Sequence, residues 1–334
     1  MNTDALQGLV YKKSIGTYYV KTDEGQLVTC TISSRLRKQL IYPMRDPSSL
    51  GHYSVASVED IRMLDPVAVG DRVSFITSGP DSGHITGVLP RTSKLTRRAA
   101  ENEHLEQVIV ANADQVITVI AAANPKPKWN LLDRYLASAE ASDLPAIIAI
   151  TKVDLVQGTK AEREVLAHAE EYASIGYRVI LTSAAKGEGI DDLRDALRDK
   201  MSTLIGKSGV GKTSLLNALQ PGLGLRVNEI NTKIDKGRHT TTSLEMYPLA
   251  FGGHLVDTPG MKVFGLWDIE PEEVALLYRE MAPYVGTCKF GLSCTHEHEP
   301  GCAITRAVGS GAISKHRYQS YLRLIETLDD EDAE

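Results

Sequence analysis

The sequence predicts a multidomain fold in which a small β-barrel is followed by an α/β domain and a mostly helical C-terminal domain. Three observations support this: short strand-like segments in the first 90 residues, alternating strands and helices from about residue 107, and a cysteine cluster near the C-terminus. With 334 residues and 42% hydrophobic content, the chain can form two or three substantial cores. We expect the barrel at 1–92, a basic linker at 93–106, the α/β domain at 107–268 and the helical domain at 269–334.

Bulk properties favour a cytoplasmic protein. The N-terminal segment has no signal-peptide pattern, and the longest apolar stretch, residues 116–123, is too short to span a bilayer. We therefore expect no membrane partner, and nothing in the sequence requires more than a monomer. The net charge is −6, yet residues 1–100 hold 13 Lys and Arg against 9 Asp and Glu, which permits a polyanionic partner.

Strands are expected in the first domain at 8–14, 17–22, 26–32, 71–78 and 82–90, separated by glycine-containing turns. This pattern suggests an OB-like barrel, which either binds RNA or only packs against its neighbour. Cys30 stands alone in a strand-like segment and is expected to be a buried thiol. The basic stretch after the barrel, including Arg97 and Arg98, could contact phosphates or be a solvated linker.

The α/β domain shows the alternation of a doubly wound sheet. Strands are expected at 114–123, 145–154, 177–184 and 202–206, with helices at 129–142, 161–176 and 189–200 and a further strand pair at 242–250 and 253–260. Such sheets bind ligands at the carboxyl ends of their strands. Motifs that follow these strands are therefore the candidates for a functional site.

A phosphate-binding loop is indicated by "GKSGVGKT", residues 206–213, between a predicted strand and a predicted helix. Glycines let backbone N–H groups turn inward around phosphates, and the helix N-terminus adds a favourable field. We expect Lys212 to reach the β- and γ-phosphates and Thr213 to ligate Mg²⁺. The full set of expected nucleotide contacts from this loop is Gly206, Lys207, Ser208, Gly209, Val210, Gly211, Lys212, Thr213 and Ser214.

A second phosphate motif, "LVDTPG", follows about 45 residues after the lysine of the loop. Asp257 at its strand end can hold Mg²⁺ through a water, and Gly260 can present its N–H to the γ-phosphate. The next residue, Met261, stands where many GTPases have a water-orienting glutamine, so hydrolysis should be slow without help. His239 is our candidate to orient the water, and Thr241, within three consecutive threonines, could close on Mg²⁺ and the γ-phosphate.

Two loops supply the expected contacts to the base. In "TKVD", residues 151–154, Asp154 can accept both guanine N–H groups, which adenine lacks, so the motif favours GTP and disfavours an ATP-dependent enzyme. Lys152 would lay its stem along the base, and Thr151 completes the motif. A companion loop, "TSAAKGEG", would hold the base edge through Ser183, Ala184 and Ala185.

The order of these motifs is unusual, because the base-reading motifs precede the phosphate loop. The same sheet can be assembled if the old chain ends are joined and new ones are opened at a surface loop. The sequence therefore predicts a circularly permuted GTPase domain whose switch segments lead into the C-terminal domain.

A metal site is predicted in "CKFGLSCTHEHEPGC". Cys288, Cys294, His296 and Cys302 provide three thiolates and an imidazole, a closed tetrahedral donor set suited to one structural zinc ion. His298 is a competing ligand, and reduced thiols without metal are the alternative.

Taken in order, "TKVD", "SAAKGEG", "GKSGVGKTSLLNAL", "GRHTTT", "DTPGM" and the cysteine cluster ending in "EPGCAI" resemble the RsgA (YjeQ/YloQ) family over essentially the whole chain. The resemblance implies a bacterial circularly permuted GTPase with an N-terminal OB domain and a C-terminal zinc domain. It further implies binding to the small ribosomal subunit and its rRNA late in assembly, with GTP hydrolysis stimulated by that subunit. By position, the family's phosphate and Mg²⁺ roles fall on Lys212, Thr213 and Asp257, and its guanine roles on Lys152 and Asp154.

Two features depart from the family pattern. Thr151 stands where Asn is usual, which can weaken base binding, and five residues separate Cys288 from Cys294 where four are expected. The alternative function is an RNA-binding assembly scaffold whose nucleotide site senses GTP but is catalytically weak. The missing glutamine favours that alternative, whereas the intact Lys212 and Asp257 oppose it.

Overall fold

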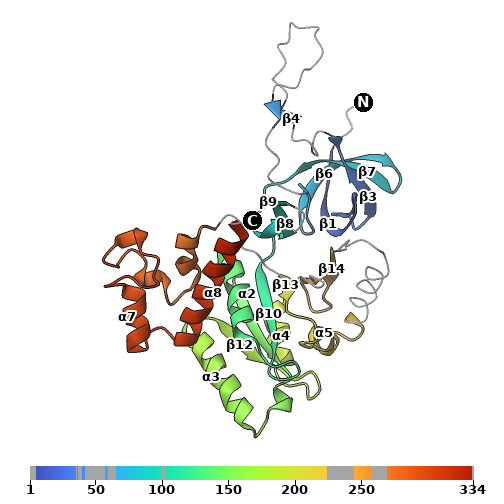
Figure 1. Ribbon diagram of the computed structural model, residues 1–334. Coiled ribbons are helices and arrows are strands. Elements are labelled where there is room, and N and C mark those ends of the chain that lie inside the picture. The colour runs from blue at the N-terminus through green and yellow to red at the C-terminus, as the bar shows by residue number, and fades with distance from the viewer. Residues whose placement is uncertain are drawn as a thin grey trace. The chain divides into compact units, whose positions relative to one another are not determined.

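The structure is a computed structural model, and its described residues are 5–34, 36, 40–41, 57–58, 65–99, 102–223, 244–257 and 269–332 (Figure 1). The chain forms two compact units. The first contains Met1–Asn112 and Asn231–Tyr247, and the second contains Ala113–Ile230 and Pro248–Glu334.

Five strands of the first unit close into a barrel. They are β1 (Leu6–Ser14), β2 (Thr17–Thr22), β3 (Leu27–Ile32), β6 (Arg72–Gly79) and β7 (Ser82–Val88). Neighbouring strands pair in the order β1, β2, β3, β7, β6, and β6 returns to β1; the β3–β7 pair is parallel and the other pairs are antiparallel. The predicted OB-like barrel is confirmed.

The barrel interior follows from the alternation of its strands. Every second residue points inward, and these side chains form one apolar core that consists of Val10, Tyr18, Val20, Val28, Cys30, Val67, Val73, Phe75 and Ile85. Gly8 lies where strands approach closely, since a Cβ there would lie 2.8 Å from the Lys21 carbonyl oxygen. Two short pairings are added: β4 (Leu40–Ile41) with β5 (Ser57–Val58), and β14 (Leu244–Pro248) with β1.

The stretch expected to be a basic linker, 93–106, lies mostly in an antiparallel hairpin of the first unit. Its strands are β8 (Lys94–Ala99) and β9 (Asn102–Ala111). The hairpin forms because Leu95 and Val110 pair and are fully buried, while Ala111 donates its N–H to the Val69 carbonyl at 2.9 Å. The basic side chains had concealed this apolar pattern, and the unit ends at Asn112.

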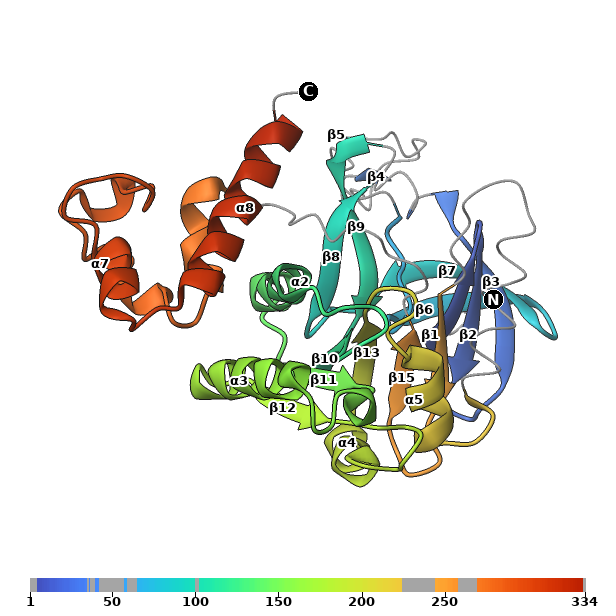
Figure 2. The ribbon, with the colours of Figure 1, turned by 60° about the horizontal axis from the view of Figure 1, so that its bottom comes forward.

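The second unit contains a parallel sheet in the order β12 (Arg178–Leu181), β11 (Ala146–Thr151), β10 (Gln115–Ala121), β13 (Met201–Ile205) and β15 (His254–Asp257). All residues of β10 and β11 are buried, as expected for strands covered on both faces. The helices are α2 (Trp129–Ala141), α3 (Lys160–Ser174), α4 (Ile190–Leu197) and α5 (Lys212–Leu219), with the single turn η1 (Val153–Leu155). Figure 2 shows α2 on one side of the sheet and α4 on the other.

The C-terminal segment contains three 3₁₀ helices and two α-helices in its described part. These are η2 (Pro271–Leu277), η3 (Ala282–Tyr284), η4 (Gly291–Ser293), α7 (Ala303–Ser310) and α8 (Lys315–Asp332). Helix α8 packs against α2 and η2. Among the residues that the structure describes, no helix combines the length and apolar character needed to cross a bilayer.

A buried ion network joins α8 to α2. Arg317 is 1% exposed and donates to Asp133 of α2 at 2.6 Å and to Glu280 at 2.6 and 3.1 Å. Tyr172 donates its hydroxyl to the same Asp133 oxygen at 2.6 Å. Both carboxylates raise the pKa of Arg317 although its burial opposes this, so the guanidinium stays charged.

Candidate functional site

The sequence motifs converge on one edge of the parallel sheet. Strands β13, β11, β12 and β15 run in the same direction, so the loops that follow them meet at their carboxyl ends. These loops carry the phosphate motif, "TKVD", "TSAAKGEG" and Asp257 in turn.

Glycines shape the loop between β13 and α5. A side chain at Gly206 would place its Cβ 2.6 Å from the Val119 carbonyl oxygen, so only glycine fits there. Gly209 and Gly211 have φ angles of 82° and 96°, and Gly211 is the N-cap of α5. In this conformation the loop runs directly into the positive end of a helix, as an anion site requires.

Lys212 folds back over this loop. Its Nζ donates to the carbonyl oxygens of Gly206 and of Lys207, the latter at 3.1 Å. Burial lowers the pKa of Lys212, whereas the nearby Asp257 carboxylate opposes that shift. Asp257 ends β15 and is 5% exposed, so the structure places the two groups close enough to interact. Thr213 lies half-buried at the start of α5, and Ser214 is exposed.

The "TKVD" loop is hydrogen-bonded to the phosphate loop. Thr151 donates its hydroxyl to the Val210 carbonyl, and Lys152 donates to the carbonyls of Gly209, at 2.7 Å, and of Asn124. Lys152 adopts a left-handed conformation with φ of 58°. The side chains of Thr151 and Lys152 therefore tie the "TKVD" loop to the backbone of the phosphate loop. Thr151, which departs from the family pattern, is one of these two links.

The companion loop orients the aspartate expected to read the base. Ser183 is fully buried and donates its hydroxyl to Asp154 Oδ1 at 2.6 Å. The backbone of Ser183 is fixed in turn, because its N–H donates to the Glu188 carbonyl at 3.0 Å. Ala184 is half-buried and Ala185 is exposed. One carboxylate oxygen is thus held by the protein, and Asp154 is half-buried at the site.

Three of the expected site residues, His239, Thr241 and Gly260, lie outside the described residues, as does Met261.

The structure also reveals a feature that the motifs did not indicate. A groove of about 540 Å³ runs beside Gly206, Lys207 and Ser208 and is lined on its other side by α2 and α8. Four of its lining residues are basic: Lys128, Arg134, Lys207 and Arg323. On α8 the groove is lined by Ser320, Arg323 and Thr327. Their helical spacing was the only feature of the sequence that could have indicated this face of the helix.

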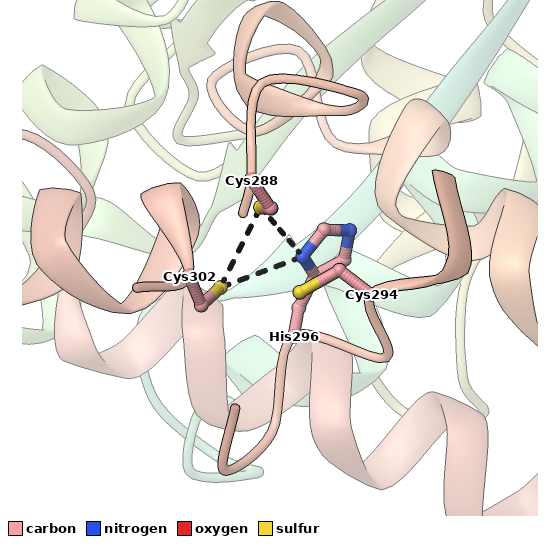
Figure 3. A group of neighbouring side chains, drawn as sticks. All are labelled: Cys288, Cys294, His296 and Cys302. Atoms are coloured by element: carbon pink, nitrogen blue, oxygen red, sulfur yellow. Dashed lines mark hydrogen bonds between the residues drawn. The ribbon is translucent and has the colours of Figure 1, made fainter. Parts of the chain in front are cut away.

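The cysteine cluster is assembled as predicted (Figure 3). One donor atom from each of Cys288, Cys294, His296 and Cys302 lies within 4.8 Å of all the others. The Cys288 and Cys302 sulfurs each lie 3.5 Å from His296 Nδ1 and 3.9 Å from one another. These four side chains are at most 7% exposed. Separations of this size fit four ligands around one metal ion, and the imidazole in this group is that of His296, since His298 is exposed and outside it.

Backbone N–H groups next to the cluster donate hydrogen bonds to two of its sulfurs. The Ala303 N–H donates to Cys288 Sγ at 3.2 Å, and the Thr305 N–H donates to Cys302 Sγ at 3.4 Å, where Cys302 caps α7. Burial opposes ionisation of Cys302, but the hydrogen bonds outweigh it and lower the pKa of this thiol. Burial also lowers the pKa of His296, which keeps its imidazole neutral for binding a metal.

Comparison with known proteins decides the family. The family model described as RsgA GTPase matches residues 88–267 of the chain. A relative from Gemmatimonas aurantiaca, named small ribosomal subunit biogenesis GTPase RsgA, is 39% identical, and the match covers 98% of each chain. This chain belongs to the RsgA family. A protein with the same name from Bacteroides fragilis is 37% identical, with 96% of each chain covered.

Solved structures agree with this membership. YjeQ from Thermotoga maritima matches with a TM-score of 0.72 and 31% identity, covering 97% of this chain and 98% of that one. YloQ, described as a circularly permuted GTPase, matches with a TM-score of 0.67 and 28% identity, covering 99% and 97%. The resemblance inferred from the motifs, the fold class and the permuted GTPase domain are therefore confirmed, and the chain is a GTPase of the RsgA family.

Proposed function

We propose that this chain hydrolyses GTP to GDP and phosphate as a late checkpoint in small ribosomal subunit assembly, and that the subunit stimulates the reaction. The observation that carries the proposal is that hydrogen bonds join the "TKVD" loop to the phosphate loop. The relatives of this chain are named for small ribosomal subunit biogenesis. In this proposal the protein acts in the cytoplasm as a monomer and contacts rRNA.

We assign the site residues as follows. Lys212 would stabilise the charge that develops on the transferred phosphoryl group, and Asp154, with Lys152, would select guanine. When bound, Mg²⁺ would neutralise phosphate charge, held by Thr213 and, through water, by Asp257. The backbone from Gly206 to Ser214 would surround the phosphates, while Thr151, Ser183, Ala184 and Ala185 would complete the base site.

The remaining roles complete the scheme. His239 would orient the attacking water, Thr241 would close over the γ-phosphate, and Gly260 would donate its N–H to that phosphate. The cysteine cluster would hold one structural zinc ion, since its closed set of four ligands leaves no position for a substrate. Zinc would then stabilise the C-terminal segment and take no part in hydrolysis.

Phosphate release from GTP, measured with and without purified small ribosomal subunits, tests the proposal. We expect a slow basal rate and a many-fold increase with subunits. Lys212→Ala should lower the stimulated rate by about 100-fold or more, because it deletes the charge on the phosphate path. A rate that subunits do not change, despite tight GTP binding, would instead support the scaffold function.

Base selection has its own test. Asp154→Asn should weaken GTP binding relative to XTP, because the amide matches the xanthine edge and not the guanine edge. The matched control is Asp195→Asn on α4, which is exposed and lies outside every motif. Unchanged preference for GTP in Asp154→Asn would show that another group reads the base.

A further inference from the structure

A second cluster of metal-binding side chains lies outside both sites described above. His168 and Glu171 are one turn apart on α3, and His316 stands near the start of α8. Their candidate ligand atoms, one from each residue, all lie within 4.8 Å of one another. His168 Nδ1 and Glu171 Oε2 are 3.1 Å apart, and all three residues are half-buried. They belong to the same compact unit although nearly 150 residues separate them in the chain.

Several polar atoms of this cluster have no hydrogen-bond partner. Among the residues that the structure describes, Glu171 Oε1 and His316 Nδ1 are buried without one, and so is Oδ2 of the neighbouring Asp133. Buried acceptors in this condition carry a desolvation cost, so their coincidence at one place calls for a ligand. Carboxylate oxygens and an imidazole nitrogen without a hydrogen-bond partner are groups that can bind a cation.

We propose that His168, Glu171 and His316 bind a divalent transition-metal ion, with zinc as the first candidate. Two imidazoles and one carboxylate suit such ions, and three protein ligands leave one position for water. Metal–ligand bonds of about 2.1 Å require ligand atoms to lie about 3.3 Å apart. The His168–Glu171 pair already has this separation, and small side-chain rotations of partly exposed residues bring in His316.

Asp133 lies next to His316 without a hydrogen bond between them, in a position to support this histidine if it binds a metal. His316 Nε2 lies 3.7 Å from Asp133 Oδ2, which leaves Nδ1 for the metal. A carboxylate that accepts the second N–H of a ligand histidine fixes the ring and strengthens it as a donor. The metal would cross-link α3 to α8 beside the buried Asp133–Arg317 pair, and thus fasten the C-terminal segment to the α/β domain.

Zinc content of the full-length protein tests this proposal. The purified chain is saturated with Zn²⁺, freed of excess by gel filtration, and analysed for zinc per chain. His316→Ala and Glu171→Gln should each hold one zinc fewer than the unsubstituted chain. Glu171→Gln preserves side-chain shape, so it keeps the test valid where His316→Ala fails to fold. His84→Ala, which removes an exposed histidine of the barrel, should lose none.

The difference of one ion does not depend on whether the cysteine cluster is filled, nor on GTP hydrolysis. Equal zinc content in the unsubstituted chain and both site variants would overturn the proposal, as would loss of an ion in His84→Ala.

A tryptophan provides a second readout. The rings of Trp129 and His168 stack with centroids 4.2 Å apart, so a paramagnetic ion held by His168 would quench Trp129 fluorescence. The chain has two tryptophans, and Trp267→Phe isolates this one. Co²⁺ added to the Trp267→Phe protein as purified should quench it saturably, with the quenching lost in the Glu171→Gln background. Persistence of the same quenching in that background would place the ion elsewhere.

Discussion

The barrel and the C-terminal segment differ in what stabilises them. In the barrel, each strand is hydrogen-bonded on both sides and the core is apolar, including Cys30, which is fully buried. The C-terminal segment has three short 3₁₀ helices and two α-helices in its described part, and its core includes three cysteines and borders the charged Arg317. The same residue type thus occurs in two settings, as a single packing thiol in the barrel and as part of a cluster that could hold a metal ion in the C-terminal segment.

The difference explains why the C-terminal segment, and not the barrel, depends on buried ion pairs and a metal site. A closed barrel satisfies its own backbone groups, so burial of apolar surface is enough to fix it. Short segments leave many backbone groups unpaired and bury little area, so buried ion pairs and the proposed metal would fix their positions. Burial raises the pKa of Cys30 to about 11, which keeps it an unreactive thiol, whereas hydrogen bonds lower the pKa of Cys302.

The largest expected effect is metal removal. Chelation, or Cys302→Ser, should unfold the loop of the cluster and α7 while the barrel stays folded, because structural zinc contributes on the order of 10 kcal/mol in small domains. Hydrogen exchange measures this: amides of 288–310 should lose protection, and those of the barrel strands should keep theirs. Simultaneous loss of protection in both regions would contradict the comparison.

Breaking the buried ion network should come next. Arg317→Met should lower the free energy of unfolding by about 3–5 kcal/mol, because it leaves the Asp133 and Glu280 carboxylates buried without their cation. Urea unfolding followed by circular dichroism measures the change. The control is Arg323→Met on the exposed side of the same helix, expected within about 0.5 kcal/mol. Equal effects of the two substitutions would show that the network adds no stability.

Substitution of Cys30 in the barrel should lower the free energy of unfolding less than substitution of Arg317. Cys30→Ala removes one buried atom from an apolar core and should cost about 1 kcal/mol, similar to other single-group deletions. Cys30→Ser should cost more, because its hydroxyl would enter a core that consists of apolar groups and one tyrosine. Denaturant titration of both variants gives the order. A serine variant as stable as the alanine variant would mean that the barrel core is more hydrated than its packing indicates.

A surface ion pair of the barrel should have the smallest effect. Arg72 donates to Asp23 at 2.9 Å, and their side chains are 44% and 68% exposed. Arg72→Met should change the free energy of unfolding by less than about 1 kcal/mol, because solvent screens such pairs. A loss as large as that of Arg317→Met would remove the distinction between the two regions.

Much of the site could be predicted because its residues follow one another in short motifs. The phosphate loop, "TKVD" and the cysteine cluster each contain their chemistry within 15 residues, so spacing reveals them. The hairpin at 94–111 was not predicted, because its alternation is hidden under basic side chains and its partner, Val69, is distant in the chain. The proposed roles of His239, Thr241 and Gly260 stay predictions.

By itself the sequence determined the family, the order of domains and the ligand-bearing motifs, since glycines, thiolates and carboxylates at fixed spacing are local properties of the chain. Which distant groups meet could be seen only in the folded chain. Folding joined Thr151 to the phosphate loop, surrounded Arg317 with two carboxylates, and brought His168 and Glu171 to His316. The physical reason is that such contacts depend on how helices and strands pack, and packing responds to the whole apolar pattern and not to any short motif.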